Sequence, residues 1–129
     1  MKKLISLIFC VFFFFISAVV AQFEQQDIFQ SANKAFSNKK YDEAIQLYES
    51  ILDKNYQSSE LYFNLGNAYY RLNKVAESIY YFEKAKQLNP LDEDIQINSA
   101  FAKNMTIDAI EKLFKILDIN AKVIVWYKN

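Results

Sequence analysis

The sequence of 129 residues contains a single glycine, a single proline and a single cysteine, and it has no histidine. Because glycine and proline are the residues that most often interrupt helices, their scarcity indicates helices joined by short turns. Without histidine, and with only Cys10 as a thiol, the chain has no zinc-ligand cluster and no cysteine–histidine pair. It also has no glycine-rich phosphate loop. We therefore expect no catalytic residues, no metal site and no cofactor.

Residues 1–21 differ from the rest of the chain. The positive pair Lys2-Lys3 precedes an apolar run from Leu4 to Val20, and Ala21 offers a small residue for cleavage. This order is typical of a secretory signal peptide. The run of about 17 apolar residues also comes close to the length that spans a bilayer. We therefore expect a signal peptide, with an uncleaved membrane anchor as the alternative, and export to the periplasm or the periplasmic face of the inner membrane.

Positive and negative charges are balanced, with 15 Lys and Arg residues against 15 Asp and Glu. Removal of Lys2 and Lys3 with the N-terminal segment leaves 13 basic and 15 acidic residues, a net charge of −2. A nucleic-acid-binding protein needs a basic surface that neutralises phosphates. The composition predicts no nucleic-acid partner and favours other proteins as partners.

The chain resembles itself at one constant offset. Several identities recur at this offset: Phe29 with Phe63, Asn33 with Asn67, Lys40 with Lys74, Glu43 with Glu77, Ile45 with Ile79, and Glu49 with Glu83. Apolar residues follow the i, i+3, i+4, i+7 spacing of a helical face, as in Tyr41, Ala44, Ile45 and Tyr48. A period of this length, about 34 residues, is typical of helix–turn–helix units that stack into a solenoid.

The second unit, Ser59 to Asp92, resembles a tetratricopeptide repeat. The positions that carry the resemblance are Tyr62, Leu65, Gly66, Tyr69, Ser78, Phe82, Ala85 and Pro90. The first unit, Gln25 to Ser58, matches less closely, and a third begins at Glu93. The resemblance implies an all-α, helical-hairpin solenoid of two clear repeats and a partial third, capping helical pair, with helix pairs near 25–54, 59–89 and 93–117. The repeat domain is expected to cover residues 22–117.

Small residues recur in the first helix of each unit, at Ala32, Gly66 and Ala100. Such residues allow the two helices of a unit to approach closely. Leucine at position 66 should therefore overpack the crossing. Because alanine occupies the equivalent positions and glycine weakens helices, Gly66→Ala is expected to be mild or stabilising.

The same stripe of side chains occurs on the first helix of both units. Phe29, Asn33 and Phe36 are matched by Phe63, Asn67 and Tyr70, and Asn64 and Arg71 flank the second set. First helices line the concave face of such solenoids, so these eight residues are the predicted peptide-binding groove, with amides for a peptide backbone and aromatic rings for contact area. On this interpretation Asn33, Asn67, Phe63 and Tyr70 form one continuous concave surface and are at least partly exposed. Replacing both asparagines with alanine should then cost within about 0.5 kcal/mol. The alternative is that the rings only pack between helices.

The segment from Leu88 to Leu113 resembles the region after the repeats in the BatE-like proteins of the Bacteroides aerotolerance group. That resemblance implies a cell-envelope protein that works beside von Willebrand-type Bat proteins, with a role in oxygen tolerance or stress. Relatives commonly continue into a membrane-spanning segment, whereas residues 118–129 are expected to be a C-terminal tail that is native or truncated. Membrane association could come from the N-terminal segment or from a partner.

Two classes of function follow from these observations. The first is an exported scaffold for protein–protein interactions in a cell-envelope complex. The second is a periplasmic assembly or chaperone-like factor that binds apolar segments of client proteins. An enzyme is disfavoured by the missing residue types.

Overall fold

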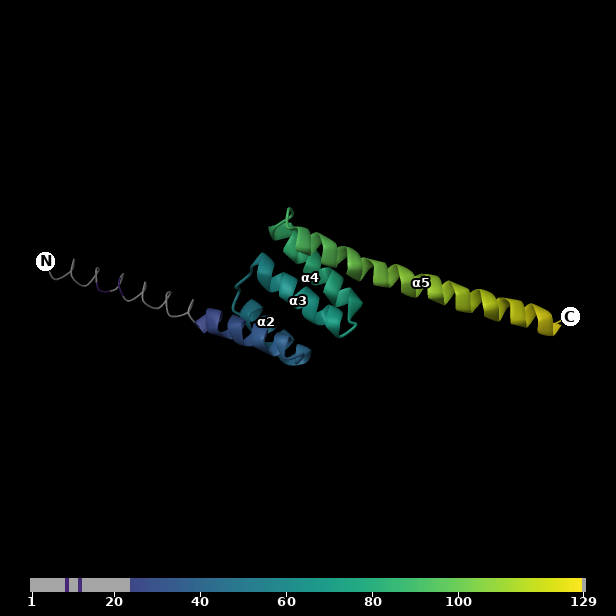
Figure 1. Cartoon of the computed structure of the whole chain (residues 1–129), viewed down its shortest axis with the longest axis horizontal. Coiled ribbons are helices and arrows are strands. Elements are labelled where there is room, and N and C mark those ends of the chain that lie inside the picture. Colours follow the sequence, from purple (N-terminus) through teal and green to yellow (C-terminus); the bar gives the residue numbers. More distant parts are fainter. Residues whose placement is uncertain (1–8, 10–11, 13–23, 129) are drawn as a thin grey trace. The chain divides into compact units, whose positions relative to one another are not determined.

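The structure, a computed structural model, describes Phe9, Phe12 and residues 24–128 (Figure 1). The first hairpin helix covers residues 24–37. It is followed by α2 (Tyr41–Asp53), α3 (Ser59–Arg71), α4 (Val75–Leu88) and α5 (Glu93–Lys128). No strand occurs among the described residues. The predicted all-α fold of helical hairpins is confirmed.

The chain divides between Gln57 and Ser58 into two compact units, each built on one helical hairpin. Residues 24–37 and α2 form the hairpin of the first unit, and α3 and α4 form that of the second, which also contains α5. The division coincides with the end of the first sequence repeat. The expected boundary after Ala21 lies outside the described residues.

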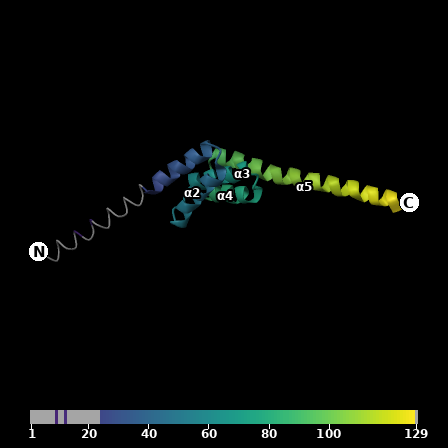
Figure 2. The same ribbon diagram turned by 90° about the horizontal axis from the view of Figure 1, so that it is seen from below.

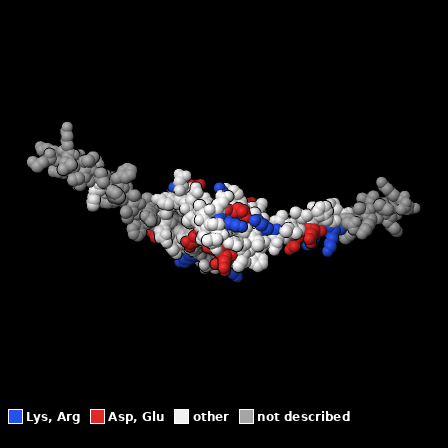
Figure 3. Space-filling model, turned by 90° about the horizontal axis from the view of Figure 1, so that it is seen from above, with Lys and Arg blue, Asp and Glu red and all other residues white. Residues whose placement is uncertain are grey.

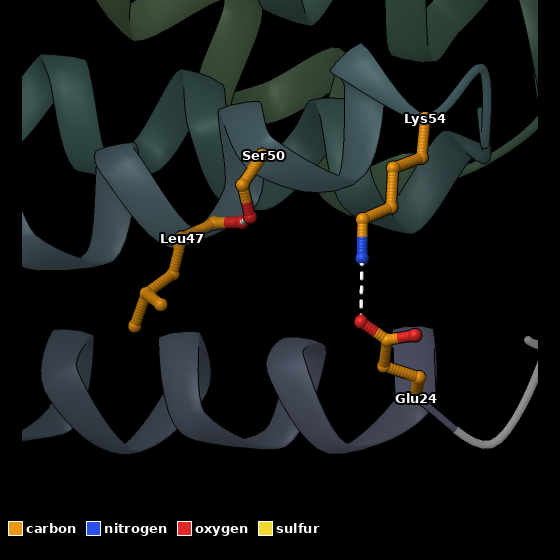
Figure 4. Close-up of polar contacts among 4 residues, drawn as sticks. All are labelled: Glu24, Leu47, Ser50 and Lys54. Carbon is orange, nitrogen blue, oxygen red and sulfur yellow. Dashed lines mark hydrogen bonds and ion pairs between the residues drawn. The ribbon is translucent and has the colours of Figure 1, made fainter.

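The hairpin of the first unit is held by apolar residues and by one ion pair across its open end. Its buried apolar residues are Ala32, Ala35, Ala44, Ile45, Tyr48 and Ile51. Lys54 Nζ, just after α2, lies 2.7 Å from Glu24 Oε1 at the start of the first helix (Figure 4). One turn earlier, Ser50 Oγ donates to the Leu47 carbonyl at 2.7 Å, so its hydroxyl is satisfied within α2.

Both hairpin turns use the same backbone conformation at equivalent positions. Lys39 and Asn73, which are one repeat period apart, have φ values of 62° and 59°. Their amides donate to Phe36 and Tyr70 carbonyls at 2.9 and 3.0 Å, which closes the end of the preceding helix. Asparagine tolerates this left-handed region, whereas a lysine there is strained.

Relief of this strain gives a stability prediction. Lys39→Gly is expected to raise the free energy of unfolding by about 0.5–1 kcal/mol, because glycine adopts a positive φ without steric cost and loses part of that gain in chain entropy. The matched control is Lys34→Gly, at an exposed helical position, which should lower it by about 1 kcal/mol. Urea denaturation of the full chain, followed by circular dichroism, measures both. A loss of stability in both variants would show that Lys39 is not strained.

The starts of α3 and α5 are capped in the same way. The Ser58 hydroxyl accepts from the Leu61 amide at 3.0 Å, and Asp92 Oδ1 accepts from the Ile95 amide at 3.2 Å. Ser58 and Asp92 occupy the same position in successive repeats, so the repeat period sets where each of these helices begins. A capping oxygen at this position satisfies one of the unpaired amides of the first turn.

The third helical pair expected over residues 93–117 is instead one continuous helix, α5. The position equivalent to Lys39 and Asn73 in the third register is Ile107. A β-branched side chain is very unfavourable at positive φ, so no hairpin turn forms there and the helix continues. The backbone of residues 118–128, expected to be a tail, is part of the same helix.

The side chains that would face a second helix also differ in the third register. In the second unit, Tyr62 and Tyr69 of α3 lie against Tyr81 of α4, with ring centroids 6.1 and 5.4 Å apart. Gln96 and Lys103 stand at the positions equivalent to the two α3 tyrosines, and both are exposed. The two positions whose tyrosines stack on the second helix of the hairpin in the second unit are therefore polar in α5, and they offer no aromatic contact for such a helix.

The small residues of the first two units are buried, and the one in α5 is not. Ala32 and Gly66 are buried, as predicted for close helix crossings. Ala100 is exposed, contrary to the expectation, because α5 does not fold back on itself to cover it. At Gly66 an added Cβ would lie 2.6 Å from Cδ1 and 2.7 Å from Cε1 of the buried Phe82 ring. The expectation that Gly66→Ala is mild is therefore revised, because the Phe82 ring would have to shift to accept the added Cβ, and such a shift in a packed core costs stability.

No helix among the described residues is long and apolar enough to cross a membrane. Nearly all of the apolar run that ends at Val20 lies outside the described residues.

Candidate functional site

In the first unit, the predicted groove residues contact the second helix of their own hairpin. Phe29, Asn33 and Phe36 are half-buried. The Tyr48 hydroxyl donates to Asn33 Oδ1 at 2.6 Å, and the Phe29 and Tyr48 rings lie 5.8 Å apart. The Phe36 ring meets Tyr41 edge-on at 5.3 Å. These contacts give the stripe a packing role in this unit. Asn33 is partly exposed, as expected, but its side chain also accepts a hydrogen bond from the second helix of the hairpin.

The equivalent residues of the second unit are arranged differently. Phe63, Asn64, Asn67 and Tyr70 are half-buried, and Arg71 is exposed. Phe82 stands where the first unit has Tyr48, so no hydroxyl reaches Asn67 from α4. Asn67 Oδ1 instead accepts a hydrogen bond of 2.9 Å from Asn98 Nδ2 of α5. In the second unit, the asparagine of α3 is therefore hydrogen-bonded to an asparagine of α5, whereas in the first unit it is hydrogen-bonded to a tyrosine of the same hairpin.

A hollow of about 140 Å³ lies at this junction of α3 and α5. Its lining residues are Asn67, Tyr70, Arg71, Phe82, Asn98 and Phe101. Small-molecule sites usually have volumes of about 300–1,000 Å³. A cavity of about 150 Å³ accommodates a ring the size of benzene. The hollow therefore has room for one apolar side chain rather than for a cofactor.

The chemistry of the lining suits a side chain that arrives on a peptide. The Phe101 ring is 58% exposed and offers apolar contact area beside the opening. The amides of Asn67 and Asn98 can both donate and accept hydrogen bonds, and the guanidinium of Arg71 donates only. The lining thus combines apolar contact area with hydrogen-bond donors that match carbonyl or carboxylate oxygens.

The structure brings together three predicted residues, Asn67, Tyr70 and Arg71, around the hollow. Sequence reasoning missed Phe101 and did not include Asn98 in the site. The signal was available, because Asn98 follows Asn64, and Phe101 follows Asn67, by one repeat period. The idea that the stripes of both units form one continuous groove stays a prediction.

The α4–α5 contact includes a charged cluster centred on Glu83. Glu83 Oε1 lies 2.6 Å from Lys103 Nζ and accepts from Ser99 Oγ at 3.2 Å. The hydrogen bond from Lys103 is the main reason that the pKa of the Glu83 carboxyl is lower than its ordinary value, and Ser99 and Lys86 act in the same direction. These contacts help to fix the part of α5 that carries Asn98 and Phe101.

The lowered pKa of Glu83 predicts how the contribution of the Glu83–Lys103 ion pair to stability depends on pH. A carboxyl with a lower pKa in the folded state stabilises the fold above its unfolded pKa, and this stabilisation is lost as the pH falls through the folded value. Lys103→Gln should lower the free energy of unfolding by less than about 1 kcal/mol at pH 7, because both partners are partly exposed. The difference from the parent should shrink at an acidic pH, once the Glu83 carboxyl is protonated in the folded state. Urea titrations at both pH values test this, with Lys34→Gln as the control. An unchanged difference at the lower pH would contradict the role of the ion pair.

Metal binding has no structural support among the described residues, which contain no group of three or more acidic, histidine or cysteine side chains that could hold an ion. The hollow is lined by amides, aromatic rings and one guanidinium, which are not a metal-ligand set.

Comparison with protein families shows a match to the family described as "Tetratricopeptide repeat" over residues 29–93. The matched segment covers 65 of the 129 residues. The chain belongs to the tetratricopeptide repeat family. Tetratricopeptide repeats mediate protein–protein interactions and act as non-catalytic scaffolds. The match ends at Glu93, the first residue of α5. The hollow is therefore lined on one side by residues of the matched repeats and on the other by Asn98 and Phe101, which follow the match.

No curated protein matches the chain. The narrower resemblance to the BatE-like tetratricopeptide proteins is supported by no relative.

Proposed function

We propose that this chain is an exported scaffold that binds an apolar segment of a partner protein in the hollow between α3 and α5. The observation that supports the proposal is the combination of a cavity sized for one side chain with an exposed ring, Phe101, and the amides of Asn67 and Asn98 at its wall. In interfaces, an aromatic or aliphatic anchor seated in a pocket supplies most of the binding energy. The occupant would be an extended or helical segment with an apolar anchor.

The proposed setting is a cell-envelope complex. The order of charges, apolar residues and a small residue in 1–21 supports export. The resemblance of Leu88 to Leu113 to the BatE-like proteins supports von Willebrand-type Bat proteins as partners, with a role in oxygen tolerance or stress. Most of this segment belongs to α5, which also forms one wall of the hollow.

The test compares two exposed aromatic residues of the second unit. Phe101 lines the hollow and is 58% exposed, whereas Tyr80 lies on α4, is 56% exposed and is not among the lining residues. Full-length chain with a C-terminal tag is used to capture its partner from envelope extracts, and the captured partner is identified by mass spectrometry. Phe101→Ser should reduce capture roughly tenfold, as expected for the loss of an interface anchor. Tyr80→Ser should stay within about twofold of the parent.

The outcomes separate the two classes of function. Reduced capture of one fixed set of partners by Phe101→Ser supports a scaffold. Capture of many unfolded proteins would instead support the chaperone-like alternative. Equal capture by Phe101→Ser and the parent would show that the hollow is not the binding site.

A further inference from the structure

The part of α5 that follows its contact with α4 carries a row of exposed apolar residues. Every residue from 106 to 117 is exposed. Six large apolar side chains in this stretch are between 48% and 66% exposed: Ile107, Ile110, Leu113, Phe114, Ile116 and Leu117. In both views this half of the helix extends past the α3–α4 hairpin (Figures 1 and 2). Nothing in the described part of the second unit covers it.

These side chains form one face of the helix, which we call the α5 apolar face. Its central residues are Ile110, Leu113, Phe114 and Leu117, spaced i, i+3, i+4 and i+7. The charged residues Asp108, Glu111, Lys112 and Lys115 repeat the same spacing on the opposite side. Figure 3 shows charged side chains along one edge of this part of the helix and uncharged ones over the rest of the visible face.

The charged side supports the helix without a partner. Asp108 and Lys112, and likewise Glu111 and Lys115, are four residues apart with the acidic residue first. This order stabilises an exposed helix by about 0.2–0.5 kcal/mol per pair. This charge order adds to the stability of the stretch while its apolar face is uncovered.

We propose that the α5 apolar face is covered by the same face of a second copy of this chain, in an antiparallel pair related by a two-fold axis between Glu111 and Lys112. A two-fold contact requires a surface that complements itself. With the axis at this point, Ile110 lies opposite Leu113 of the second copy. The small Ala109 lies opposite the large Phe114, so the volumes also complement each other.

No charge needs to be buried in this pair. The residues Asp108, Glu111, Lys112 and Lys115 all lie on the side of α5 that turns away from the second copy. Burial of an unpaired charge would cost several kcal/mol. The contact surface of the partner should be uncharged as well. The α5 apolar face of a second copy is such a surface.

The available area suits a small, transient interface. Six apolar side chains that are about half exposed present on the order of 500–600 Å² per chain, the size of the largest apolar patches on monomeric proteins. A crossed pair covers mainly the four central residues of each face, so it buries less than about 1,000 Å² in total, which is the size of weak, transient interfaces. The pairing is therefore expected to be reversible and dependent on concentration.

The position of α4 fixes how the two helices must meet. Ile95, Ser99 and Ala102 of α5 are buried on the same side as the α5 apolar face, where α4 packs. A second helix that ran strictly antiparallel would reach α4, so the two α5 helices must cross. A crossing of about 50°, the commonest in globular proteins, keeps the second helix clear of α4. The residues at position 105 of the two copies are then separated by about 20 Å of helix rise, which leaves room for both hairpins.

Disulfide cross-linking in the full chain tests the pairing and its register. Cys10 is first replaced with serine, so that introduced cysteines are the only thiols. Two differently tagged chains are co-expressed, one with Ile110→Cys and the other with Leu113→Cys. Mild oxidation should link them efficiently. The matched control uses Asp108→Cys with Lys115→Cys, which lie at the same level along the pair but on the charged side, and should give at least tenfold less product.

A second measurement does not depend on thiols. Full-length chain in mild detergent is examined by sedimentation over a range of concentrations, together with Leu113→Glu and the control Lys115→Glu. Leu113→Glu should weaken self-association at least tenfold while helicity is unchanged, and Lys115→Glu should behave like the parent. A parent that remains monomeric up to about 100 µM, a concentration at which RT ln K corresponds to only about 5–6 kcal/mol of association, would overturn the proposal. So would equal linking of the two cysteine pairs, or cysteines at 110 and 113 that are protected by lipid vesicles and never link.

Discussion

Gly66→Ala is expected to lower the free energy of unfolding of the second unit by about 1–2 kcal/mol, because overpacking outweighs the gain in helix propensity. The added Cβ would lie 2.6 Å from the Phe82 ring, which is fully buried. Gly66→Leu should cost about 3 kcal/mol, since the larger side chain enters the same closed crossing. Urea denaturation monitored by circular dichroism gives both values.

A double-mutant cycle isolates the cause. In a Phe82→Leu background, the ring that blocks the Cβ is removed, and Gly66→Ala should then be neutral or slightly stabilising, as helix propensity predicts. If Gly66→Ala is as stable as the parent when Phe82 is present, the close contact does not limit packing at this crossing.

Asn33→Ala is expected to destabilise the first unit by about 1–3 kcal/mol, because it removes the acceptor of a buried hydroxyl. Tyr48 is only 1% exposed, and its hydroxyl donates to Asn33 Oδ1 at 2.6 Å. The matched control is Asn67→Ala. Its partner Asn98 is half-buried beside the hollow and can turn to water, so the cost there should be below about 1 kcal/mol.

Thermal and urea denaturation of the two variants measure this difference. The predicted cost at Asn33 is larger than the value of about 0.5 kcal/mol expected from the sequence, because that value applies to polar side chains without a buried partner. Equal, negligible costs at both positions would show that the Tyr48–Asn33 hydrogen bond contributes nothing to stability.

The hairpins were predictable from the sequence because the repeat acts locally. Ser58 and Asp92 start helices at equivalent positions, and Lys39 and Asn73 end them, so the repeat period is enough to place each element. The predicted third hairpin does not form, and the residue at its expected turn is Ile107. Its β-branched side chain is very unfavourable at positive φ, so the helix continues, whereas the prediction of a third helical pair rested on the need for about three stacked units.

The site was predictable only in part because its contacts depend on distant residues. The predicted stripe includes Asn67, Tyr70 and Arg71, which come from one helix and line the hollow. Asn98 and Phe101 reach the hollow only because α5 packs beside α3 and α4, a placement that periodicity does not give. In the same way, spacing indicated that Gly66 faces a second helix, but only the structure shows the Phe82 ring 2.6 Å from an added Cβ.

The most direct test of the central claim, that the hollow between α3 and α5 receives a partner's side chain, is photo-cross-linking from position 101. A photoreactive phenylalanine replaces Phe101 in the full chain, and in a matched control it replaces Tyr80, which is similarly exposed on α4. In envelope preparations, position 101 should give a defined adduct with one or a few proteins through a segment that carries an apolar anchor, and position 80 should not. The absence of an adduct at 101, or the same adducts from both positions, would contradict the account.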